Sequence, residues 1–240
     1  MYHSITFGDK NTYDDWHLVP SSRPVFAPPP VKTTYLDLPG ANGKLDLTDA
    51  LNGHPMFENR TGSIEFIVLN DYGEWQNRYS EISNYLHGKK MKAVLEDDPG
   101  WYYEGRFSVN EWASEKDWSR ITIDYDLYPY KKEVVDSLED WKWDPFDLVN
   151  GIIREFRGIK VDEVNGATVV DVPGSYEMIA PLIIVESSDG KGMTMLYGGV
   201  EYHLYDGENK NPNLIIANTT SQMIIHGNGK ITIAYRGGSL

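Results

Sequence analysis

Histidine is the residue type of this chain best suited to bind a metal or to move a proton near neutral pH. The six histidines lie far apart in the sequence, at His3, His17, His54, His87, His203 and His226. No two of them form the His-Glu-x-x-His pair that places two zinc ligands on one face of a helix. Spacing therefore predicts no metal site, although histidines that are distant in sequence can still meet in a fold.

Carboxylates are the second group that could do chemistry. A glycosidase needs two of them facing each other across a sugar, about 5–10 Å apart. The run Glu96-Asp97-Asp98 precedes Pro99-Gly100, which favours a turn, because Asp side chains bond to nearby backbone. Asp124 and Asp126 would share the solvated face of one strand. We therefore expect neither group to be catalytic.

Nucleophile and cofactor motifs are missing from the sequence. The chain has no cysteine, so thiolate nucleophiles, thiolate metal sites and disulfides are excluded. There is no Gly-x-Ser-x-Gly elbow, P-loop, EF-hand loop or Gly-x-Gly-x-x-Gly leading into a helix. We predict that the protein is not an enzyme and has no catalytic residue, no cofactor and no metal.

Sugar binding is the alternative function that the residues leave open. Exposed aromatic side chains on a β-sandwich can stack on sugar rings, and Trp101-Tyr102-Tyr103 and Tyr202–Tyr205 are the candidates. The competing interpretation is that one face of each strand packs these rings into the core. The alternative prediction is a carbohydrate-binding module that recognises glycans of a cell surface.

The elements that must position these residues are predicted to be mainly β. The 240 residues include 7 Trp, 16 Tyr and 7 Phe, and strands are enriched in aromatic and β-branched residues. Apolar residues alternate with polar ones in Thr33–Leu38, Ser63–Val68 and Ser119–Tyr125. This alternation is typical of half-buried strands.

One or two helices interrupt the strands. A helix is predicted near residues 72–87, because its apolar residues recur at spacings of four, three and four. These residues are Trp75, Tyr79, Ile82 and Leu86. Asn70 or Asp71 can cap its start and Gly88 can end it. A shorter helix is predicted through Leu45–Leu51, ended by Gly53.

We predict two domains joined by a linker. Residues 1–132 form a β domain that contains the helix, 133–151 form the linker, and 152–240 form an all-β domain. The linker segment includes Ser137 and Asp140, which resemble a capping box. Turns are predicted between the last domain's short strands, which suggests a sandwich or barrel. These turns are at Asn165-Gly166, Asp189-Gly190, Asp206-Gly207 and Gly227-Asn228-Gly229.

Charge and proline content describe the surface. The formal net charge of -14 predicts no attraction to nucleic-acid phosphates, and acidity of this size favours solubility. No signal peptide or membrane-spanning stretch is visible in the sequence. Pro28, Pro29 and Pro30 predict an extended polyproline arm, since they fit neither a helix interior nor a central strand. The arm is either a strut that touches a neighbouring subunit or an ordinary surface loop.

Several segments, in their order along the chain, resemble the distal tail proteins (Dit family) of long-tailed phages, the siphophages. The segments are Tyr2–Gly8, Asn11–Pro20, Asn59–Ser63, Leu86–Lys90, Leu95–Pro99, Tyr103–Phe107, Gly227–Ile233 and Tyr235–Leu240. The resemblance implies an N-terminal β-sandwich or split barrel with a helix, and a C-terminal galectin-like β-sandwich.

The resemblance also implies a structural role in the virion. Six copies of such a protein form a ring at the tail tip or baseplate. The hexamer joins the tail tube protein to the tail-associated hub protein and, in some phages, to receptor-binding proteins. We expect assembly in the host cytoplasm, no membrane, and contacts between subunits in the N-terminal domain, with Pro28, Pro29 and Pro30 as interface candidates. Acidic residues lining the ring would let DNA pass through the channel without specific binding.

Overall fold

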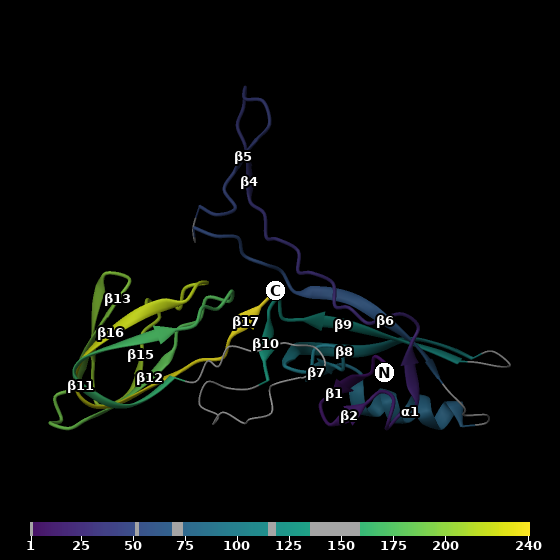
Figure 1. The fold of residues 1–240 in the computed structure, drawn as a ribbon. Helices are drawn as coiled ribbons and strands as arrows, with labels where there is room; N and C mark the ends of the chain where they lie inside the picture. The colour runs from purple at the N-terminus through teal and green to yellow at the C-terminus, as the bar shows by residue number, and fades with distance from the viewer. Residues whose placement is uncertain (1, 51–52, 69–73, 115–118, 135–158) are drawn as a thin grey trace. The chain divides into compact units, whose positions relative to one another are not determined.

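The computed structural model describes residues 2–50, 53–68, 74–114, 119–134 and 159–240. The chain divides into two compact units, Met1–Lys131 with Leu240, and Lys132–Ser239. Figure 1 shows the elements of each unit. The linker predicted at 133–151 lies outside the described residues from position 135 on, and Ser137 and Asp140 lie outside them too.

The first unit is built on one antiparallel sheet whose strands follow the order β2-β1-β7-β8-β9-β6-β3. Their bounds are β1 (Ile5–Phe7), β2 (Lys10–Asn11), β3 (Leu18–Pro20), β6 (Arg60–Val68), β7 (Lys89–Leu95), β8 (Trp101–Ser114) and β9 (Ser119–Leu127). Alternate residues of β9 are buried, as the apolar alternation predicts. Strands β6 and β9 contain the alternating segments Ser63–Val68 and Ser119–Tyr125.

The predicted helix is α1 (Trp75–Leu86), the one helix among the described residues. Ile82 and Leu86 are fully buried, and Trp75 and Tyr79 pack against the same core. The helix ends two residues before Gly88, whose φ of +74° suits glycine. Asn70 and Asp71, the predicted caps, lie outside the described residues. No helix in the described part of the chain is long and apolar enough to cross a membrane.

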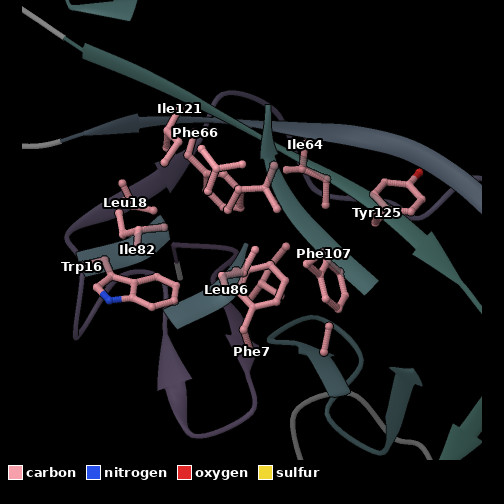
Figure 2. Close-up of a cluster of buried hydrophobic side chains, with 14 of the residues drawn as sticks. Phe7, Trp16, Leu18, Ile64, Phe66, Ile82, Leu86, Phe107, Ile121 and Tyr125 are labelled. Carbon is pink, nitrogen blue, oxygen red and sulfur yellow. The ribbon is translucent and has the colours of Figure 1, made fainter. Parts of the chain in front are cut away.

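Aromatic and branched side chains from the sheet and α1 form the core of the first unit (Figure 2). Phe7 meets Phe107 edge to face at 4.8 Å between ring centroids, and Trp16 is completely buried. Edge-to-face contacts of this kind add to the stabilisation from burial alone. This core therefore packs β1, the segment around Trp16, α1 and the central strands of the sheet against one another.

The predicted helix Leu45–Leu51 is wrong. Lys44–Asp46 forms strand β5, which pairs with β4 (Tyr35–Asp37) in a two-stranded hairpin. The backbone of β5 forms hydrogen bonds with β4 and not within a helix. After the strand, the Asp46 carboxylate accepts the N–H of Thr48 at 2.9 Å, and this bond stabilises a turn. Short polar side chains that bond to nearby backbone disfavour a helix interior in this way.

The second unit is a second antiparallel sheet, with strand order β14-β13-β16-β12-β15 and β11 paired to β16. The bounds are β11 (Ile159–Val172), β12 (Leu182–Ser187), β13 (Met193–Tyr197), β14 (Val200–Leu204), β15 (Gly207–Lys210) and β16 (Ser221–Ala234). Short strands β10 (Lys131–Glu133) and β17 (Gly238–Ser239) pair with each other. Leu214 and Ile216 lie outside these strands but are buried in the core of the unit.

Two of the turns predicted in this unit are wrong, because β11 and β16 are continuous. Asn165 and Gly166 pair with Asn228 and Gly227 inside the ladder between the two strands. Before this point β16 pairs with β13, and after it β16 pairs with β12. The glycines thus mark a corner at which one strand changes partner, and the sheet folds into the two halves of a sandwich.

The predicted fold class, mainly β with a helix and two β domains in sequence, is confirmed. The polar turn at Asp189-Gly190 lies between β12 and β13, and Asp206-Gly207 lies where the turn after β14 enters β15, with Gly207 as the first residue of that strand. Gly190 and Gly207 have φ of +67° and +92°, as such turns require.

Candidate interaction surface

The feature of the first unit that most needs a partner is its arm, defined here as residues 31–57. Strands β4 and β5 form its hairpin, which stands apart from the sheet (Figure 1). Six of its large apolar side chains are 43–53% exposed: Val31, Tyr35, Leu36, Leu38, Leu45 and Met56. Apolar side chains gathered on one exposed element are typical of interaction sites.

The hairpin is amphipathic. Leu36 lies directly opposite Leu45, so these two side chains share one face. The other face carries the pair Asp37 and Lys44, 3.6 Å apart, and the pair Tyr35 and Asp46. Hydrogen bonds from Thr48 lower the pKa of Asp46. A two-stranded hairpin is marginally stable alone, and its open edges can pair with another chain. The apolar face has the composition of a surface that a protein partner covers.

The root of the arm is fixed at Ala27, immediately before the three prolines. Its N–H donates to the Tyr125 hydroxyl at 3.0 Å, and its carbonyl accepts from Arg60 Nη1 at 3.1 Å. Phe26 beside it is buried against the rings of Tyr103 and Tyr125. These contacts therefore fix the direction in which the chain leaves the core toward the hairpin.

Arg60 is buried, with 3% of its surface exposed, and its Nε donates to the Pro129 carbonyl at 2.7 Å. Its guanidinium also lies 5.5 Å from the centre of the Tyr103 ring, a cation–π contact. Burial lowers the pKa of Arg60 from its usual value, yet an arginine stays charged at any physiological pH. The buried guanidinium of Arg60 thus binds both the root of the arm at Ala27 and the loop after β9.

The three prolines lie between this anchor and the hairpin in an extended stretch. Pro29 is buried, whereas Pro28 and Pro30 are exposed. The Pro30 carbonyl accepts the N–H of Glu58 at 2.8 Å, and Val31 pairs with Phe57 in the first bridge of the arm. The predicted polyproline segment is therefore the base of the arm, and its role as an interface remains a prediction.

On the returning side of the arm, Phe57 packs edge to face on Tyr130 at 5.9 Å. Asn59 then donates to the Asp126 carboxylate at 2.7 Å. Both sides of the base are thus held by the sheet, while the tip is exposed. Ordering the base in advance lowers the entropy lost when the tip binds.

The carboxylate run Glu96-Asp97-Asp98 is a structural clamp. Glu96 accepts from the backbone N–H and hydroxyl of Ser4, and Asp97 accepts from His3 Nδ1 at 2.9 Å and Arg23 Nε at 2.9 Å. Burial alone would raise the pKa of Asp97, but the bonds from Arg23 and His3 hold it below its ordinary value. Glu96 and Asp97 thus hold the N-terminal residues in place, and Asp98 pairs with the ammonium group of Lys131 at 2.9 Å.

The remaining candidates for chemistry stay apart. Asp124 is half-buried and Asp126 exposed on the polar face of β9, as predicted. His87 Nδ1 accepts the N–H of Val109 at 3.1 Å and so ties the end of α1 to β8. In the described ranges, no group of three or more histidines and carboxylates could hold a metal ion.

The two aromatic runs differ in exposure. Tyr102 and Tyr103 are buried, and Trp101 lies under the ammonium group of Lys131 at 5.1 Å, so this run serves packing. Tyr205 in the second unit is 74% exposed. The packing interpretation therefore holds for the first run and not for Tyr205.

Comparison with known proteins is informative at the level of structure. No family model matches the chain, and no curated protein matches it significantly. Among solved structures, it is similar to the crystal structure of SPP1 Dit (gp 19.1), described as a paradigm of hub adsorption apparatus in Gram-positive infecting phages. The match covers 100% of both chains with a TM-score of 0.65 and 12% sequence identity. Across its whole length, this chain therefore has the fold of a phage distal tail protein.

Proposed function

We propose that the protein is a distal tail protein of a long-tailed phage, a structural hub between the tail tube and the proteins that adsorb to the host. The observation that carries this proposal is the full-length similarity in fold to SPP1 Dit. Both units match in one chain and in the same order, which a chance likeness between two common β domains would not produce. The proposed role needs no catalytic group.

Six copies form a ring through the first unit. A contact of this kind joins two different surfaces of identical subunits, and the ring closes by rotation. The arm supports this ring contact for two reasons. The apolar face formed by Leu36 and Leu45 is exposed, and Arg60 and Tyr125 hold the root of the arm in place. Each arm, together with Pro28, Pro29 and Pro30 that precede it, lies against the neighbouring copy.

The ring has one side toward the tail tube protein and the other toward the tail-associated hub protein of the tail tip or baseplate, with receptor-binding proteins attached in some phages. Its place is the virion, after assembly in the host cytoplasm. The net charge of -14 per copy supports a channel that repels phosphates, so that DNA passes without sticking.

Size-exclusion chromatography with light scattering on the full chain tests the proposal. The measurement is made on the protein alone and after co-expression with the tail-associated hub protein of the same phage. We expect a mass of six copies in at least one of these samples. A protein that stays monomeric in both and does not bind the hub protein would refute the proposal.

A further inference from the structure

The second unit contains a pocket that the hub role does not use. It lies between the end of β14, strand β15 and the loop that follows, and has a volume of about 330 Å³. Its apolar lining comes from Ile183, Leu204 and Leu214, all of which are buried. The volume is within the range of small-molecule sites, about 300–1,000 Å³.

The walls of the pocket are fixed by asparagine side chains. Asn209 accepts the N–H of Tyr205 at 2.8 Å and donates to the carbonyls of Tyr205 and Gly207 at 2.7 and 3.0 Å. Asn211 accepts the N–H of Asn213 at 2.9 Å in the same manner on the other side. The loops on both sides are therefore held in place before any ligand arrives, which lowers the entropic cost of binding.

A further hydrogen bond fixes the turn between β14 and β15. The Asp206 carboxylate accepts the N–H of Ser187 at 2.7 Å, and hydrogen bonding from the side chain and the backbone of Ser187 lowers the pKa of Asp206. Asp206 is thus tied to the end of β12, beside the pocket. The turn that carries Tyr205 is held from both of its ends.

Three polar side chains of the lining are available to bind a ligand. The side chains of His203, Glu208 and Lys210 make no hydrogen bond or ion pair within the described part of the chain. Together they offer a carboxylate that accepts, an ammonium group that donates, and an imidazole that can do either. Tyr205, also in the lining, contributes an aromatic ring that is 74% exposed.

These groups discriminate between classes of ligand. An apolar molecule would bury three polar side chains without partners, which is costly. An anion would meet the Glu208 carboxylate and a cation the Lys210 ammonium group, so a net charge of either sign is disfavoured. An uncharged ligand whose hydroxyls both donate and accept, and whose C–H face can stack on an aromatic ring, suits all of them.

We propose that this pocket binds an uncharged saccharide, with one sugar ring stacked on Tyr205 and its hydroxyls bonded to Glu208, Lys210 and His203. This is a binding activity separate from assembly of the hub, since every lining residue belongs to the second unit. Its failure would leave the hub proposal unaffected.

Saturation-transfer difference NMR on the full chain tests the site, because the method detects weak ligands on assemblies of any size. The probes are glucose, galactose, rhamnose and N-acetylglucosamine, with glucuronic acid as the charged comparison. We expect transfer to the C–H protons of at least one neutral sugar, and weaker transfer to glucuronic acid because of Glu208.

Tyr205→Ala should weaken the binding of that sugar about tenfold, the size expected for one lost aromatic contact. The matched control is Tyr176→Ala, which removes another exposed tyrosine of the same unit, outside the pocket, and should change nothing. Both rings are largely exposed, so the fold should tolerate either change. An absence of transfer to every neutral sugar, or equal transfer with Tyr205→Ala, would overturn the proposal.

Discussion

At the scale of single residues, Arg60 shows how a buried charge can be retained without a carboxylate partner. Its guanidinium bonds to the carbonyls of Ala27 and Pro129 and lies against the ring of Tyr103. Carbonyl oxygens and an aromatic face replace the water that burial removes. No motif in the sequence points to this role, because it depends on residues 33 and 69 positions away.

Arg60→Ala should lower the free energy of unfolding by about 2–4 kcal/mol, because two carbonyls lose their donor in a buried site. The matched control is Arg120→Ala, which removes an exposed pair with Glu65 and should cost less than about 1 kcal/mol. Urea denaturation followed by fluorescence measures both. Equal effects of the two substitutions would show that Arg60 is not an anchor.

The Asp97 clamp predicts a pH dependence. Since its folded pKa is lowered, the stability it contributes is fully present above its unfolded pKa, about 3.9, and is lost as the pH falls through the folded pKa. Asp97→Asn should therefore lower the melting temperature at pH 7 and have a much smaller effect near pH 3. Thermal unfolding at both pH values checks this, and an effect that grows with acidity would contradict it.

At the scale of elements, periodicity predicts α1 and the alternating strands well, since each buries one regular face against the core. Local composition fails at Gly227-Asn228-Gly229. These residues are typical of a hairpin turn but lie inside β16. What decides there is the proximity of other strands. A Cβ on Gly229 would lie 2.2 Å from the Glu186 carbonyl oxygen, a contact that no local pattern contains.

Gly229→Ala should destabilise the second unit by about 3 kcal/mol or more, because a φ of +140° and a backbone clash coincide. Gly166→Ala in the paired strand is the control. Gly166 has a φ of +76° but open space around it, so only the backbone cost of about 1–2 kcal/mol remains. Differential scanning calorimetry compares the two variants. A Gly229→Ala variant as stable as the control would refute the close approach of the strands at Gly229.

The arm is the element that sequence describes least completely. Its three prolines predict an extended base, and the structure has one, yet Leu45–Leu51 reads as a helix and is partly strand. The hairpin pairing of β4 with β5 and the exposure of its apolar face come only from the folded chain. An apolar segment whose partner is another molecule cannot be recognised from patterns that assume an internal core.

At the scale of the whole molecule, the order of the two β units and the helix was predictable, and the candidate site only in part. The resemblance of scattered segments anticipates the fold that the comparison with SPP1 Dit shows. It points neither to the pocket beside Tyr205 nor to Arg60 as the anchor of the arm. Both depend on side chains that tertiary structure brings together.

A shortened arm should separate folding from assembly. Val31 and Phe57 are bridge partners, so joining them through Asn-Gly in place of residues 32–56 restores a two-residue hairpin. We expect this variant to fold and to stay monomeric. A milder version, Leu36→Ser with Leu45→Ser, should weaken assembly, whereas Asp37→Asn on the opposite face should not. Sedimentation velocity measures all three, and assembly of the shortened variant would exclude the arm from the interface.

The most direct measurement of the central claim is negative-stain electron microscopy of the full chain, alone and with its tail-associated hub protein. The proposed hub predicts closed rings with six-fold symmetry in class averages, and their loss in the variant with the shortened arm. Single compact particles in every sample, with no ring in either preparation, would contradict it.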